Sequence, residues 1–147
     1  MKDLKPTLLF LLVALLFSIT ISAQNERPQV HNFQNFINQV YTGDGVEQIQ
    51  PSTRRYAYMK ELFENRIVYT KKDMGKLDLA GYTLLSQIPL YDTYNKSLTR
   101  DESFNPRTFN PFKYQFLFYT KKTLMIRVDG TEYVIVIYPQ ESTQTTK

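Results

Sequence analysis

Apolar residues recur every three or four positions in two segments of the first half of the chain. In residues 29–41 this spacing places one apolar stripe on a helix, with Pro28 in its first turn and Gly43 at its exit. A second stripe runs to residue 65 and follows Ser52 and Thr53, either of which can cap a helix N-terminus. Two amphipathic helices are therefore predicted. Their stripes are Val30, Phe33, Phe36, Ile37, Val40 and Tyr41 in the first and Tyr56, Met59, Leu62 and Phe63 in the second.

The pattern changes to one typical of strands after residue 65. Residues 66–70 are rich in β-branched side chains, and residues 82–88 form a further candidate strand that Pro89 ends. Residues 112–119 alternate in period two, with Phe112, Tyr114, Phe116 and Phe118 on one face. Residues 123–128 and 131–138 flank Asp129-Gly130, a strong hairpin signal.

A two-residue turn at Asp129-Gly130 would set the register of this hairpin. It would pair Arg127 with Glu132 on one face and leave an apolar opposite face. The fold class expected is α+β, with two N-terminal helices packed on a small antiparallel sheet that ends in a C-terminal three-stranded meander. The full predicted register is Val128 with Thr131, Arg127 with Glu132, Ile126 with Tyr133, and Leu124 with Ile135.

The first 23 residues have the pattern of a cleavable signal peptide. Two lysines precede an uncharged run over residues 7–21, which is shorter than the roughly 20 apolar residues of a spanning helix. Ala23 offers a small residue for cleavage, and the alternative is an uncleaved N-terminal anchor. We therefore expect export to the periplasm or the exterior as a single domain, residues 24–147, with mobile ends at 24–28 and 140–147 and no stable membrane anchor after cleavage.

Composition excludes several kinds of chemistry. The chain has no cysteine and one histidine, so disulfides, thiolate metal sites and sites of two or more imidazoles are ruled out. After cleavage 16 basic residues would face 13 acidic ones, with the charges interspersed, so nucleic-acid binding is not expected. No cofactor and no metal is predicted, since Arg100 and Arg107 would repel a calcium ion from the nearby carboxylates and amides.

Residues 91–112, hereafter the 91–112 loop, lack helical or strand periodicity. Such a long irregular connection in a small domain is often functional, and its aromatic and aliphatic anchors argue against disorder. It contains the tandem Phe104-Asn105-Pro106 and Phe109-Asn110-Pro111, where each Phe is expected in the core and each Asn at the start of a turn. Arg100 beside Asp101 suggests an internal ion pair that fastens the loop.

The tyrosines, amides and charges of this loop are the residues typical of a binding surface. We expect a small exported, non-catalytic binding or accessory module, whose partner is another exported protein or a surface glycan. The alternatives are a glycan-directed hydrolase that uses Asp92, Asp101 or Glu102, and a purely structural exported protein. The oligomeric state is left open. The candidate binding residues are Tyr91, Asp92, Tyr94, Asn95, Arg100, Asp101, Asn105 and Asn110.

Overall fold

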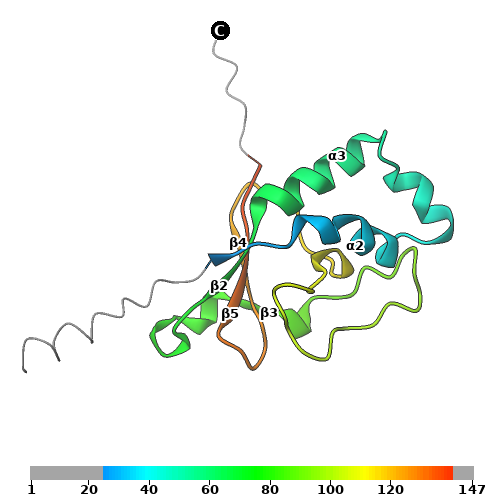
Figure 1. Ribbon diagram of the computed structural model, residues 1–147. Helices are drawn as coiled ribbons and strands as arrows, with labels where there is room; N and C mark the ends of the chain where they lie inside the picture. Colours follow the sequence, from blue (N-terminus) through cyan, green and yellow to red (C-terminus); the bar gives the residue numbers. More distant parts are fainter. Residues whose placement is uncertain (1–24, 141–147) are drawn as a thin grey trace, which may run out of the picture.

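The computed structural model describes residues 25–140, apart from the side chain of Leu79 (Figure 1). The signal peptide predicted for residues 1–23 and the tail from residue 141 lie outside the described residues. Between them, residues 25–140 form a mixed α+β domain with two α-helices and a five-stranded sheet. No helix in this part of the chain is long and apolar enough to cross a membrane. The predicted α+β class is confirmed.

Both segments with helical spacing form helices. A 3-10 turn, η1 (Val30–Asn32), leads into α2 (Phe33–Val40), and α3 (Arg54–Glu61) continues into one π-helical turn, η3 (Leu62–Arg66). The Thr53 hydroxyl caps α3 by accepting a hydrogen bond from the backbone N–H of Tyr56 at 3.1 Å. A 3-10 segment, η2 (Gly43–Ile49), joins the two helices.

The sheet has the strand order β1-β2-β5-β4-β3. The strands are β1 (Asn25–Glu26), β2 (Ile67–Lys71), β3 (Thr83–Leu84), β4 (Leu124–Arg127) and β5 (Tyr133–Ile137). The β1–β2, β2–β5 and β5–β4 pairs are antiparallel, whereas β3 and β4 are parallel. The sheet is thus mixed rather than purely antiparallel, and residues 25–26, which the sequence placed in a mobile leader, pair with β2.

Residues 112–119 do not form the predicted third strand of a C-terminal meander. A 3-10 turn, η7 (Pro111–Lys113), begins the segment, and β4, beside which a meander would place it, already has β5 and β3 as its neighbours. The amides of Phe116 and Phe118 instead donate to the carbonyls two residues earlier. The side chains still alternate between buried and exposed, because the rings of Phe116 and Phe118 are buried whereas Leu117 and Tyr119 are exposed.

The predicted strand over residues 82–88 is also shorter than expected. It contributes only β3, after which the chain turns into a 3-10 segment, η6 (Leu85–Gln87).

The hairpin between β4 and β5 differs from the predicted register by two residues. Ile126 pairs with Ile135 and Arg127 with Val134, so the predicted Arg127–Glu132 pair does not form. The Val128 amide donates to the Tyr133 carbonyl at 2.9 Å, which leaves a turn of four residues, 129–132. The Thr131 hydroxyl donates to the Val128 carbonyl and accepts from the Tyr133 amide, which stabilises the longer turn. Because a shift of two leaves every side chain on the same face, the predicted apolar face is retained.

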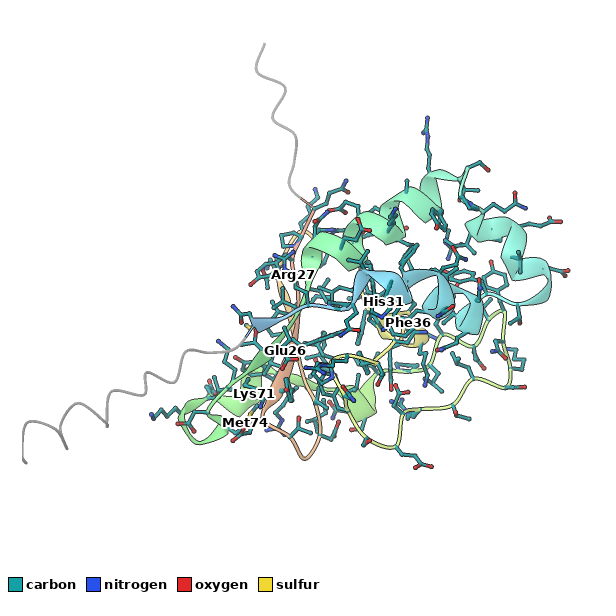
Figure 2. All side chains as sticks on the ribbon, in the orientation of Figure 1. Glu26, Arg27, His31, Phe36, Lys71 and Met74 are labelled. Carbon is teal, nitrogen blue, oxygen red and sulfur yellow. The ribbon has the colours of Figure 1, made fainter. Side chains whose placement is uncertain are left out.

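The helices and the 91–112 loop cover one face of the sheet. Figure 1 shows α2 and α3 on the same side, and Figure 2 shows Phe36 among the side chains there. The hydrophobic cluster on the other face of the sheet is smaller, and consists of Val68, Val134 and Val136 with Met74 and Tyr82 packed against them. Figure 2 labels Lys71, the last residue of β2, and Met74 in the turn that follows it. On the helix side the strands supply Ile67, Tyr69, Ile126, Ile135 and Ile137, and the main aromatic partners are Phe33, Phe36, Phe63 and Phe112.

Gly45→Ala is expected to destabilise the domain. A Cβ at residue 45 would lie 2.5–2.8 Å from three carbon atoms of the Tyr94 side chain, which packs between η2 and the core. Overpacking of this kind costs about 1–3 kcal/mol, so the midpoint of urea unfolding should fall. The matched control is Gly81→Ala, because a Cβ there meets nothing within 4 Å. Equal midpoints for the two variants would contradict this packing.

Candidate functional site

The 91–112 loop is irregular, as predicted, and its aromatic side chains hold it against the domain. Phe109 is buried in the core, and Phe104 packs against it with ring centroids 4.9 Å apart. Asn105 accepts a hydrogen bond from the amide of Arg107 at 3.0 Å, and Asn110 accepts one from the amide of Phe112 at 3.0 Å. The two Phe-Asn-Pro units thus make the same Asn-initiated turn, and their structural interpretation is confirmed.

Two of the candidate binding amides attach the loop to α2. Asn110 is 1% exposed, and its Nδ2 donates to the Phe36 carbonyl and to Gln39 Oε1, both at 3.0 Å. Asn95 donates to the Gln39 carbonyl at 2.7 Å. The Asn110 side chain makes its hydrogen bonds to other groups of the domain, so the structure gives it a structural role.

Arg100 and Asp101 do not form the expected ion pair with each other, and each instead contacts residues at least 12 positions away in the sequence. The carboxylate of Asp101 accepts from Lys113 Nζ at 2.6 Å and from the Tyr114 hydroxyl at 3.2 Å. Arg100 donates to the carbonyls of Leu85 and Ile88 and lies over the Tyr114 ring. The loop is therefore fastened by both residues, as expected, but each does so through a partner outside the loop.

Tyr91 and Tyr94 face the end of α2. Their rings lie 6.0 and 5.4 Å from the ring of Tyr41, and the Tyr91 hydroxyl accepts from Arg55 Nη2 at 3.2 Å. Asp92 forms a solvent-exposed pair with Lys96 at 3.4 Å, a kind that contributes little to stability. The eight candidate residues are consequently spread over several parts of the surface and interior, and their role as ligand contacts stays a prediction.

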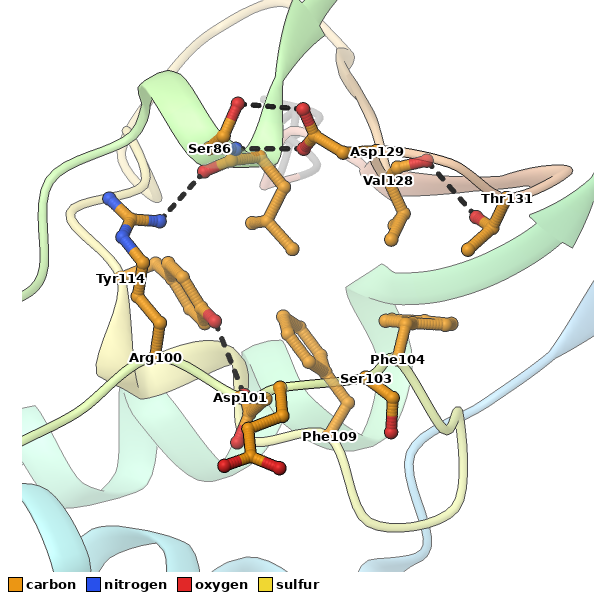
Figure 3. Close-up of a pocket in the computed structure, with 12 residues that line it drawn as sticks. Ser86, Arg100, Asp101, Ser103, Phe104, Phe109, Tyr114, Val128, Asp129 and Thr131 are labelled. Carbon is orange, nitrogen blue, oxygen red and sulfur yellow. Dashed lines mark hydrogen bonds between the residues drawn. The ribbon is translucent and has the colours of Figure 1, made fainter.

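A cavity of about 450 Å³, here called the loop–hairpin hollow, lies between the loop, η6 and the β4–β5 turn. Figure 3 shows the rings of Tyr114, Phe109 and Phe104 along one side of it and Val128 opposite. Of the eight candidates, only Arg100 and Asp101 are among its lining residues. The full lining is Leu85, Ser86, Arg100, Asp101, Glu102, Ser103, Phe104, Phe109, Tyr114, Val128, Asp129 and Thr131.

Sequence reasoning missed the half of the hollow that comes from η6 and the hairpin turn. The sequence pattern predicted only a turn at Asp129. In the structure its carboxylate also accepts from the Ser86 amide at 2.9 Å and from the Ser86 hydroxyl at 2.6 Å. No local pattern marks this contact, because the two residues lie 43 positions apart.

The polar groups at the rim are largely engaged within the protein. Burial acts to raise the pKa of Asp129, but the two hydrogen bonds from Ser86 outweigh it and lower that pKa below its ordinary value. Burial, together with the nearby Asp101 carboxylate, raises the pKa of Tyr114 to about 12. Within residues 25–140 no group of three or more His, Asp or Glu side chains is placed to hold a metal ion.

Searches with this chain matched no protein-family model, no curated protein and no solved structure.

Alkaline pH is expected to destabilise the domain through buried phenols, among them Tyr41 and Tyr114. The pKa of Tyr41, raised by burial, and that of Tyr114, raised by burial and by Asp101, are both about 12, against an ordinary value of 10.0. Since the folded state favours the protonated phenols, their contribution to stability is complete below pH 10 and is lost as pH rises towards about 12.

Urea unfolding at about pH 9 and about pH 11 measures this loss. Tyr114→Phe should reduce the fall in the unfolding midpoint, whereas Tyr138→Phe, at an exposed ring, should leave it unchanged. The same fall in all three proteins would contradict the role given to Tyr114.

Proposed function

We propose that this chain is a small exported, non-catalytic binding module, and that the loop–hairpin hollow receives an apolar side chain of another exported protein. The observation that carries the proposal is the combination of an aromatic floor with a rim on which Ser86, Arg100, Asp101 and Asp129 already have protein partners. Such a site offers apolar surface and few free hydrogen bonds, which suits an anchoring side chain better than a hydroxyl-rich glycan.

Internal contacts hold the walls of the loop–hairpin hollow in place, which supports this proposal. Asp101 ties one wall to Lys113, and Asp129 ties the hairpin turn to Ser86 on the opposite wall. A hollow that is already formed loses little conformational entropy when it is occupied, so more of the contact energy remains for affinity.

Catalysis is less well supported. A glycosidase that uses two carboxyl groups needs one that keeps its proton near neutral pH, whereas the pKa of Asp129 is lowered. Asp101 is engaged by Lys113 and Tyr114, and Asp92 lies outside the hollow. Glu102, the third carboxylate that the hydrolase alternative names, lines the hollow as an exposed side chain, outside any buried apolar setting.

Ser103→Trp tests the proposal by filling the hollow. Ser103 is an exposed lining residue, and the natural chain has no tryptophan, so the emission of the new indole reports whether its ring is shielded. Ser52→Trp is the matched control, because Ser52 is exposed outside the hollow. Both variants and the natural chain are recovered from the exported fraction, where the proposal expects Gln24 as the first residue.

The three proteins then serve to capture cross-linked partners from that fraction. We expect one exported protein that the natural chain and Ser52→Trp retain and that Ser103→Trp binds at least about tenfold more weakly, a loss of about 1.4 kcal/mol. Equal capture by all three would contradict the hollow as the binding site. Selective loss of binding to cell-wall polysaccharide, rather than to a protein, would favour the glycan alternative.

A further inference from the structure

A second, smaller crevice shares the Tyr114 ring with the hollow, and an arginine stands between two tyrosines there. Nη2 of Arg55 donates to the Tyr41 hydroxyl at 3.1 Å and to the Tyr91 hydroxyl at 3.2 Å. The guanidinium carbon lies 5.2 Å from the centre of the Tyr41 ring. The crevice has a volume of about 150 Å³, and its walls include Met59, Phe112 and the three residues of this cluster.

The hydrogen bonds of this cluster leave donors without acceptors. Each phenol oxygen accepts from Arg55, and the two phenols also interact with each other, so at least one phenol O–H remains free to donate to a ligand. Nε and Nη1 of Arg55 also have no acceptor in this part of the chain, and no described carboxylate lies within 4.0 Å of the guanidinium.

The surroundings leave these donors available to a ligand. Tyr41 is 4% exposed, and burial raises its pKa to about 12, so the phenol keeps its proton at neutral pH. Arg55 is half-buried beside aromatic walls, so its charge is screened less than that of a fully exposed arginine. An anion placed here would pair with the guanidinium and accept from the free donors.

We propose that the Tyr41–Arg55–Tyr91 cluster binds the carboxylate group of a small ligand. A carboxylate has two oxygens that accept hydrogen bonds only, which matches one guanidinium edge and a neighbouring phenol O–H group. Ligand pockets for drug-sized molecules are usually about 300–1,000 Å³, so this crevice admits a group no larger than a single ring or short chain. The site is separate from the loop–hairpin hollow, and either can fail without the other.

The test uses benzoate as the probe and benzamide as its uncharged counterpart. Each is titrated into the isotopically labelled full domain near neutral pH, and NMR shifts of the amides around Arg55 and Tyr91 give the affinity. We expect benzoate to bind at least about tenfold more tightly than benzamide, because only benzoate is purely an acceptor at its head group. N-acetyl-Gly-Phe, with a free carboxyl terminus, is the second arm and distinguishes a peptide C-terminus from a free acid as the source.

Arg55→Gln and Arg54→Gln are matched variants of neighbouring arginines on α3. They change the net charge equally, but Arg54 is exposed and outside the crevice. Arg55→Gln should weaken benzoate binding at least about tenfold, and Arg54→Gln should leave it nearly unchanged. Tyr91→Phe removes one hydroxyl and keeps the ring, so it should weaken binding by about threefold to tenfold even if Arg55→Gln fails to fold.

Three results would overturn the proposal. One is the absence of shifts at these amides with either carboxylate up to about 50 mM. Another is equal binding of benzoate and benzamide. The third is equal affinity for benzoate in the natural chain and in folded Tyr91→Phe.

Discussion

The contact between Asp101 and Lys113 is the one on which the arrangement of this domain depends most. Lys113 has a side chain only 10% exposed, so its ammonium group needs a counter-charge, and Asp101 supplies one at 2.6 Å. The same carboxylate accepts from the hydroxyl of Tyr114, whose ring contributes to both the loop–hairpin hollow and the Arg55 crevice. One carboxylate therefore fixes the loop to the segment that follows it and holds the ring shared by the two cavities.

Local features of the sequence predicted much of the fold. The two helices follow from apolar spacing, the start of α3 from the Thr53 cap, and β2 from its β-branched run. The paired Asn-Pro turns could also be predicted, because the Asn side chain bonds to the backbone two residues later, whatever surrounds it. In each of these cases the determining interaction lies within a few residues along the chain.

Features that depend on distant residues could not be predicted in this way. The register of the hairpin follows a turn that Thr131 stabilises and that Asp129 attaches to Ser86. Residues 112–119 alternate like a strand, but β4, their expected neighbour, has no free edge for them because β3 occupies it. In the candidate site, Arg100 and Asp101 were recognised as residues that fasten the loop, yet their partners come from η6 and η7. Asn95 and Asn110 were predicted as binding residues because their amides can form hydrogen bonds. In the structure these amides bond to α2.

Both binding proposals need a 91–112 loop that keeps one conformation, because this loop supplies Tyr91 to one cavity and Phe109 to the other. Hydrogen exchange of the loop amides in the native domain measures this directly. The amides of Phe109 and Phe112, bonded to the Asn105 carbonyl and the Asn110 side chain, should exchange at least about 100-fold more slowly than in an unfolded chain. Exchange of these two amides at the unfolded-chain rate, while those of β2 and β5 stay protected, would contradict a fixed loop.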